Sequence, residues 1–359
     1  DMLDNFYNTD YANTLVMTAG GKGGTSIEHL SKGNPVQNYY EDQFLASLTA
    51  LKSIADGEGK TVSCPVIVFC QGEANMTATA NGSWDGTAPA VSDKAGYKAY
   101  LEQLFIDMIA DAKSVYGQSS DPSILMYVTR GNGGDYNMNI QMAQIEVAKE
   151  NSNISIFTPT YFLTTGTDNT HPTANGYRWM GEYIAKSMYQ QVLLKKEHLY
   201  VSPRKIVWSL DNWGNDVIDI HFNVPNPPLL ANLETSLPVS EDNINSLGFM
   251  IYDNGTEINL RNVTLYDSFV RINTSGADRL TSGILNVTYG DPKNSGSGNL
   301  CDSDRFLAKS NFVSGVTLDT RTPNYYDGTS ILNNPYPLYN YCVPFSYTIT
   351  GYGEIEIDH

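Results

Sequence analysis

The sequence predicts an α/β fold followed by an all-β region. Up to about residue 198, short apolar runs alternate with amphipathic helical patterns. Beyond residue 200 the helical patterns stop, and alternating β-branched and aromatic segments appear between Asn, Gly, Pro and Asp turns. We therefore expect two domains: residues 1–198, with a parallel sheet covered by helices on both faces, and residues 199–359, a β-sandwich. The expected linker lies near residues 196–202.

The elements of the first domain are predicted from periodicity and from capping residues. The last helix is expected to bury Tyr177, Met180, Tyr183, Ile184 and Met188. In chain order, the predicted elements are a strand over 14–18, a helix over 41–55, a strand over 66–69, a helix after Ser92 and Asp93, a strand over 124–128, a helix over 140–150, a strand over 154–157 and a helix over 174–194.

The second domain is predicted to contain only strands and turns. The turn Asp253-Asn254-Gly255 is typical of a hairpin. Trp208, Trp213 and the abundant tyrosines suggest either carbohydrate binding by ring stacking or a role in assembly. The clearest predicted strands cover 205–208, 217–222, 248–252 and 346–350.

Composition and charge exclude several classes of protein. With 41% hydrophobic and 17% charged residues, the chain is globular rather than disordered. Its net charge of −17 repels phosphate, so we expect neither nucleic acid nor an anionic membrane as a partner. No apolar run approaches the roughly 20 residues of a membrane helix.

The cysteines do not suggest a metal site. Cys64, Cys70, Cys301 and Cys342 lack CxxC spacing, and we expect neither a metal nor an organic cofactor. Cys64 and Cys70 flank one predicted strand, too far apart for a disulfide, and are expected to be buried free thiols. Whether Cys301 and Cys342 pair remains open. The glycosylation sequon that begins at Asn75 would place a glycan at the predicted site, which favours a bacterial or viral source.

Three polar segments each follow a predicted strand. They are residues 20–27, 71–75 and 168–171. Because the carboxyl ends of parallel strands meet at one edge of a sheet, we expect these segments to form one site.

The segment 168–171 predicts an acid–base pair. Asp168 precedes His171 by three residues in a polar loop that leads into a helix. A carboxylate there can accept from one ring nitrogen while the other nitrogen faces a nucleophile. The remaining histidines have no such context. His171 is therefore the candidate base, and Asp168 its candidate orienting acid.

The other two segments offer candidates for oxyanion stabilisation. The Gln71 amide at a strand end can donate to a developing oxyanion, and Gly72 lets the backbone approach. Glu73 either orients Gln71 or His171 or acts as a second carboxylate. The glycines of residues 23–27 leave backbone N–H groups exposed at a strand end, without the Lys-Ser/Thr of a phosphate-binding loop.

Together, Gly23-Gly24-Thr25-Ser26-Ile27-Glu28-His29-Leu30, Gln71-Gly72-Glu73-Ala74-Asn75 and Asp168-x-x-His171 with Gly176-Tyr177-x-Trp179 resemble the SGNH (GDSL-like) hydrolase superfamily. The resemblance is closest to its sialate O-acetylesterase and acetylxylan-esterase-like branch and covers about residues 14–194. It implies a three-layer α/β/α sandwich and a serine esterase that removes O-acetyl groups from sugars.

The resemblance also implies roles for individual residues. Gly24 would be the backbone oxyanion donor and Gln71 the side-chain donor. His171 would be the base, and Asp168 its acid, with Glu73 competing for that role. Asn75 is a candidate for substrate binding.

The chain departs from the family pattern at the nucleophile. The family's serine lies in a Gly-x-Ser block upstream of the glycine segment, but residues 1–13 contain no serine. We therefore expect this chain to be the C-terminal part of a larger polypeptide whose upstream part carries the first strand and the serine. Ser26 is the alternative nucleophile, although its position belongs to the oxyanion block.

The sequence opens with no signal segment, so we expect any export signal to be absent or already removed. The high tyrosine content and the β segments rich in Asn, Gly, Ser and Thr resemble bacteriophage tailspike or tail fibre proteins. This similarity implies an extracellular, virion-borne homotrimer that deacetylates bacterial surface polysaccharide. The alternative function is a non-catalytic carbohydrate-binding or structural fibre module with an esterase-like fold. A peptidase or lipase is less well supported, since no lid segment and no Gly-x-Ser-x-Gly elbow occur.

Overall fold

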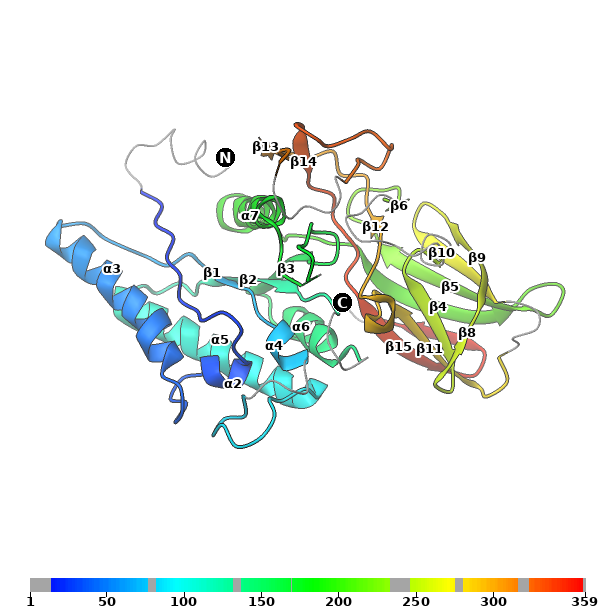
Figure 1. The fold of residues 1–359 in the computed structure, drawn as a ribbon, viewed down its shortest axis with the longest axis horizontal. Helices are drawn as coiled ribbons and strands as arrows, with labels where there is room; N and C mark the ends of the chain where they lie inside the picture. Colours follow the sequence, from blue (N-terminus) through cyan, green and yellow to red (C-terminus); the bar gives the residue numbers. More distant parts are fainter. Residues whose placement is uncertain are drawn as a thin grey trace.

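The structure is a computed structural model that describes residues 14–76, 82–131, 137–168, 170–232, 246–274, 280–315 and 323–357. The fold is broadly α/β (Figure 1). Helices and a three-stranded parallel sheet make up the first part of the chain, and antiparallel sheets make up the second.

The parallel sheet has the order β1-β2-β3, with β1 Val66–Phe69, β2 Ser123–Val128 and β3 Ile154–Pro159. The central strand β2 is buried at every position after Ser123. Such continuous apolar runs are typical of parallel strands that are covered on both faces. The strand β1 lies at an edge of the sheet.

Helices lie on both sides of this sheet. Figure 1 shows α7 on one side and α3, α5 and α6 on the other. Leu125 and Tyr127 of β2 belong to the same apolar cluster as α7, whereas Ile124 and Met126 pack with α5 and α6. The helical elements are α2 Ile27–Leu30, η1 Tyr40–Leu45, α3 Ala46–Gly57, α4 Glu73–Met76, α5 Lys94–Tyr116, α6 Asn139–Glu150, α7 Ala174–Met188 and η2 Tyr189–Leu193.

Most predicted elements of the first part are confirmed, but the strand over 14–18 is wrong. Residues 14–20 are not assigned to any strand of the sheet. Leu15, Val16 and Met17 are 37, 52 and 74% exposed. A strand requires a neighbour for its backbone groups, and a cavity separates this segment from β1. The predicted burial of Tyr177 is also wrong: it is exposed, and Trp179 fills the core instead.

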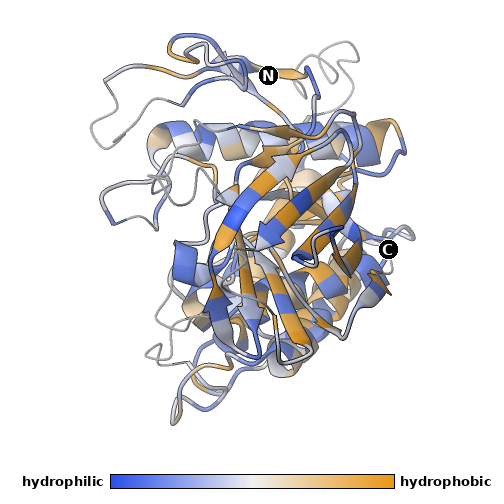
Figure 2. Ribbon diagram, turned by 90° about the vertical axis from the view of Figure 1, so that its right-hand side faces the viewer, coloured by the Kyte–Doolittle hydropathy of each residue, from blue (hydrophilic) through white to orange (hydrophobic). Residues whose placement is uncertain are grey.

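Among the described residues of the second part, two larger antiparallel sheets have apolar faces that share one cluster. Apolar and polar positions alternate along their strands (Figure 2). The hairpin at Asn254 and Gly255 is confirmed, because both residues have positive φ (47° and 84°) between β7 and β8. The larger sheets are β16-β4-β5-β10-β9 and β15-β11-β7-β8, with β4 Ser202–Leu210, β5 Asp216–Asn223, β7 Phe249–Asp253, β8 Thr256–Ile258, β9 Leu260–Leu265, β10 Phe269–Thr274, β11 Ile284–Tyr289, β15 Phe345–Thr350 and β16 Gly353–Glu356.

The remaining short elements lie near α7 and the two larger antiparallel sheets. They are β6 Leu230–Ala231 paired with β12 Leu300–Cys301, β13 Leu307–Asn311 paired with β14 Pro335–Pro337, and a 3₁₀ turn at Pro292–Asn294.

One apolar core continues from the first part of the chain into the second. The Phe162 ring stacks on Tyr341 with 3.9 Å between centroids. Trp179 Nε1 donates to the Pro337 carbonyl, and the Tyr183 hydroxyl donates to the Tyr339 carbonyl. The end of β14 and the segment that follows it therefore cover the face of α7 that points away from solvent.

The two tryptophans that suggested sugar stacking differ sharply in their exposure to solvent. Trp208 is 2% exposed and donates from Nε1 to Asp216, so it is a core residue and the prediction for it is wrong. Trp213 is 85% exposed in the turn between β4 and β5. A Trp at that position is available for contact with another molecule.

Candidate active site

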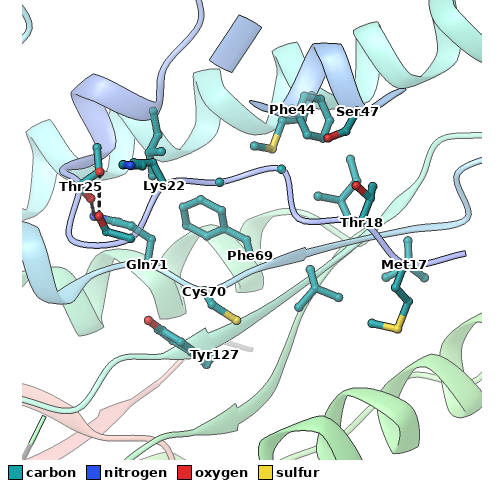
Figure 3. Close-up of a pocket in the computed structure, with 18 of the residues that line it drawn as sticks. Met17, Thr18, Lys22, Thr25, Phe44, Ser47, Phe69, Cys70, Gln71 and Tyr127 are labelled. Atoms are coloured by element: carbon teal, nitrogen blue, oxygen red, sulfur yellow. Dashed lines mark hydrogen bonds between the residues drawn. The ribbon is translucent and has the colours of Figure 1, made fainter. Parts of the chain in front are cut away.

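A cavity of about 640 Å³ lies between the extended segment 14–25, the strand β1 and helix α7 (Figure 3). Gly24, Gln71, Glu73 and His171 line it. Residues from all three predicted segments therefore reach one cavity.

Asp168 and His171 form a hydrogen-bonded pair. His171 Nδ1 lies 2.7 Å from Asp168 Oδ2, and Asp168 Oδ1 accepts from the backbone N–H groups of Thr170 and His171 at 3.0 Å each. These bonds, that from His171 foremost, lower the pKa of Asp168 to about 2. An anionic Asp168 holds the proton on Nδ1, which leaves Nε2 as the basic nitrogen.

The pair lies at the start of α7 and is open to solvent, since the His171 side chain is 76% exposed. The helix begins after Thr173, whose hydroxyl accepts from Gly176 N–H. The same loop is closed by Gly166 N–H, which donates to the His171 carbonyl. The position of His171 is thus set by the helix start and by Asp168.

Gly24 lies in the turn before α2, with φ +68°. Because residues with a side chain rarely adopt this conformation, glycine is suited to the turn. Thr25, the next residue, accepts through its carbonyl from Gln71 Nε2 at 3.2 Å. This bond fixes the glycine turn next to the end of β1.

The predicted oxyanion role of Gln71 does not fit this arrangement. Its Nε2 donates to the Thr25 carbonyl and to Asn75 Oδ1, and its Oε1 accepts from the Tyr97 hydroxyl. An amide has two N–H groups, and both are already bonded. Gln71 therefore acts as a bridge between β1, α5 and the glycine turn.

The predicted substrate role of Asn75 is also corrected. Asn75 is fully buried, and Oδ1 accepts from the Ile27 N–H as well as from Gln71. Its Nδ2 donates to Glu28 Oε2 and to the Val91 carbonyl at 2.9 Å each. Both polar atoms of this side chain are therefore bonded within the protein, and the burial also rules out a glycan in the folded state.

Glu73 lies on the cavity wall, and its hydrogen-bond partners are residues other than His171. The Tyr127 hydroxyl donates to Oε2 and the Thr129 hydroxyl to Oε1, each at 2.7 Å. Gly72 precedes it with φ +156°, and a Cβ there would lie 2.8 Å from Thr129. Of the two candidate acids, Asp168 is the one that is hydrogen-bonded to His171.

Among the described residues, no hydroxyl is hydrogen-bonded to His171 Nε2. Ser26 is buried and donates to the Gly82 carbonyl at 2.7 Å, which argues against the alternative nucleophile. Ser47 donates to the Ala19 carbonyl, and Ser63 precedes the amino end of β1.

The four cysteines are free thiols, and Cys301 and Cys342 are both buried without a disulfide. Cys70 contradicts the prediction of a buried thiol, because it is exposed to the cavity. The surrounding protein and the charge of Glu73 nevertheless raise its pKa to about 12. The thiol is therefore protonated at neutral pH and a poor nucleophile.

Arg130 was not among the predicted residues, although it also lines the cavity. It lies two residues after the end of β2, so the rule that sites gather beyond the carboxyl ends of parallel strands also points to it. Its Nε donates to the Ser295 carbonyl at 2.9 Å. Burial lowers the pKa of Arg130 to about 10, and the side chain stays cationic at neutral pH.

In the described part of the chain, no group of three or more His, Cys, Asp or Glu side chains is arranged to hold a metal ion. No helix there has the length and hydropathy to cross a bilayer.

No protein family model matches the sequence, and no curated protein is significantly similar to it.

Proposed function

We propose that this chain is part of a carbohydrate O-acetylesterase of the serine type, with a three-layer α/β/α core of the SGNH kind. The observation that carries the proposal is the Asp168–His171 pair, 2.7 Å apart, beside a cavity that Gly24 also lines. The proposed setting is an extracellular, trimeric phage tail fibre or tailspike that acts on acetylated bacterial polysaccharide.

In the proposed reaction, a serine supplied from upstream of this sequence attacks the acetyl carbonyl. His171 Nε2 takes the serine proton as the Oγ–C bond forms, and Gly24 N–H donates to the oxyanion. When the intermediate collapses, the sugar oxygen leaves with the proton from His171. Water then attacks the acetyl-serine, with His171 again as base, and releases acetate.

The test measures acetate release from an O-acetylated bacterial polysaccharide by the complete natural polypeptide. We expect His171→Ala and Asp168→Asn each to lower kcat by about 10²–10⁴-fold, because the base or its orientation is lost. His221→Ala, a change in the sandwich strand β5, is the matched control and should leave the rate unchanged. Undiminished release by His171→Ala contradicts the proposal.

One observation favours a second candidate, a non-catalytic carbohydrate-binding or structural module. Both N–H groups of Gln71 are bonded within the protein, so one of the two expected oxyanion donors is not free. If the second candidate is correct, we expect the wild-type polypeptide to bind the polysaccharide but to release no acetate. Exposed Trp213 is then the first residue to replace, with loss of binding as the readout.

A further inference from the structure

Lys186 lies in a buried polar cluster where helix α7 meets the segment that follows β14. Its side chain is 1% exposed, and Nζ lies 2.8 Å from Asp304 Oδ2, 2.6 Å from the Leu338 carbonyl oxygen and 2.8 Å from Asn340 Oδ1. Burial lowers the pKa of the Lys186 ammonium, although the charges of Asp304 and Asp302 act in the opposite direction. The amine form, which carries the nucleophilic lone pair, therefore costs less here than on a surface lysine.

The Asn340 carboxamide is oriented with its carbonyl group toward Lys186. Its Nδ2 donates to Asp302 Oδ2 at 2.7 Å, and its backbone N–H donates to Asp302 Oδ1 at 2.9 Å. Asp302 is fully buried and is held in turn by the backbone N–H and the Nδ2 of Asn226. Because Nδ2 is bonded to Asp302, Oδ1 accepts from Lys186, and the carbon Cγ lies one C=O bond, about 1.2 Å, beyond that oxygen. The amine and the carboxamide carbon are thus held next to each other.

Asp304 lies between the two nitrogens of this pair. Its Oδ2 is 2.8 Å from Lys186 Nζ and 3.4 Å from Asn340 Nδ2. One carboxylate oxygen can therefore take a proton from the first nitrogen and deliver it to the second. The Asp304 side chain is 18% exposed, so a small leaving molecule can reach solvent at this point.

We propose that Lys186 and Asn340 form an intramolecular amide cross-link between their side chains. Asp304 Oδ2 takes a proton from the ammonium, and Nζ then attacks Cγ of Asn340. As the Cγ–Nδ2 bond breaks, Asp304 carries a second proton from Nζ to Nδ2, and ammonia leaves. Of the three ammonium hydrogens, one stays on Nζ, one leaves with the ammonia and one is released to solvent. The reaction needs no oxidant, reductant or further reactant.

The positions of these groups in the fold favour the reaction. Amides react slowly with amines in water, but two groups that are fixed in contact behave as if present at roughly 10⁵–10⁸ M. An ordinary buried ion pair needs only a lysine and a carboxylate. Here a carboxamide faces the lysine, its nitrogen is held by one aspartate, and a second aspartate bridges both nitrogens. This arrangement supplies every group that the reaction requires.

The cross-link joins the two parts of the chain covalently. It connects α7 to the segment after β14, across 154 positions of sequence, and prevents the two from separating when the chain unfolds. The link also removes the charge of Lys186, after which burial alone lowers the pKa of His198. It involves no residue of the proposed esterase site and depends on no step of that reaction.

The first experiment is mass spectrometry of the complete natural polypeptide, purified in folded form and digested with trypsin. Trypsin does not cut after an acylated lysine, so residues 179–195 should stay whole and be joined to the peptide that begins at residue 322. The mass of this branched peptide should be about 17 Da below the sum of its two parts, because one ammonia is lost. Fragmentation locates the bond at Lys186 and Asn340.

Two results overturn the proposal. One is a set of linear peptides that are cut after Lys186, which shows an ordinary buried ion pair. The other is a branched peptide that joins residues 179–195 to residues 294–305 with a loss of about 18 Da, because that bond is formed by the Asp304 carboxyl with release of water.

Variants of the three reacting residues test the chemistry. Lys186→Arg and Asn340→Ala each remove a reacting group, so neither should yield the branched peptide. Asp304→Asn keeps both groups but lacks the base, and the link should form at least about 100-fold more slowly after refolding from urea. Asn334→Ala, in the same segment but bonded to exposed backbone, is the matched control and should link like the wild type. An undiminished rate in Asp304→Asn contradicts the assigned proton transfer.

Denaturing electrophoresis gives a second readout. The linked chain cannot extend fully, so it should migrate faster than the Asn340→Ala variant. The difference should persist with a reducing agent, because the four cysteines are free thiols. Equal migration of the two chains contradicts the link. Neither readout measures acetate release, so failure here leaves the esterase proposal standing, and the reverse also holds.

Discussion

At the scale of single residues, the polar segments that follow β1 and precede α2 are bonded mainly to each other. Asn75 connects Gln71, Ile27, Glu28 and the Val91 carbonyl through four hydrogen bonds. Its chemistry resembles that of a ligand-binding side chain, yet its burial makes it a structural residue. Its role is to hold the glycine turn against the end of β1.

We predict that Asn75→Ala lowers the free energy of unfolding by about 2–5 kcal/mol, because it leaves several buried donors and acceptors unpaired. Urea unfolding followed by circular dichroism measures this. Asn262→Ala on the exposed face of β9 is the matched control and should change stability by less than about 0.5 kcal/mol. Equal effects for the two variants contradict the structural role.

At the scale of elements, the start of α7 determines where His171 lies. Gly176 is in the first turn of this helix, and a Cβ there would lie 2.3 Å from the Thr164 carbonyl oxygen. The hydroxyls of Thr164 and Thr173 are also hydrogen-bonded, at 2.7 Å. The helix start is therefore packed against the loop that leads to Asp168 without room for a methyl group.

We predict opposite effects for two glycine substitutions in α7. Gly176→Ala should lower the free energy of unfolding by about 1–3 kcal/mol, because the added methyl collides with backbone. Gly181→Ala, in the same helix but with open space around it, should raise it by about 0.5–1 kcal/mol. Urea titration of both variants checks this. A change of the same sign in the free energy of unfolding of both variants contradicts the prediction.

At the scale of the whole molecule, buried polar groups lie where the two parts of the chain meet. Lys186 of α7 is 1% exposed and donates to Asp304, the Leu338 carbonyl and Asn340. His198 is buried nearby, with its ring nitrogens 2.6 Å from Gln190 and 3.1 Å from the Phe157 carbonyl. Burial, and then the charge of Lys186, lower the pKa of His198 to about 3.

We predict that stability falls as the pH drops below about 6.5. Between the ordinary His pKa of about 6.5 and the folded value of about 3, the unfolded chain binds one proton more than the folded chain. The free energy of unfolding should therefore fall by up to about 1.4 kcal/mol per pH unit. Urea midpoints between pH 6.5 and 5 measure the slope above the range in which carboxylates titrate.

His198→Gln removes the titrating group and should flatten this slope, whatever its effect on stability at pH 7. A wild-type slope of zero in the same window contradicts the buried, neutral state of His198.

Local elements were predictable because short stretches of sequence specify them. The helix α5 has its capping Asp93 and an apolar stripe, and the Asn254-Gly255 turn needs only two residues that accept positive φ. The Asp168–His171 pair belongs to the same category. Its members are three residues apart in one loop, so their contact requires no distant part of the chain.

The roles of Gln71, Asn75 and Trp208 were not predictable, because their partners are distant in sequence or depend on how the sheets pack. Asn75 is bonded to Ile27, 48 positions away, and this contact converts a candidate ligand-binding residue into a core residue. The apolar run of residues 14–18 predicts a strand, but strand formation also requires a neighbouring strand edge at hydrogen-bonding distance.

The sequence by itself therefore determined the alternation of strands and helices, the change to β structure after residue 200, and the acid–base pair at the start of α7. Only the tertiary structure decided which polar side chains are bonded within the protein, how the second part covers α7, and that β1 lies at an edge of the sheet formed by the described residues. The physical reason is that periodicity and turn chemistry act over a few residues, whereas burial and hydrogen-bond pairing depend on segments that meet only after folding.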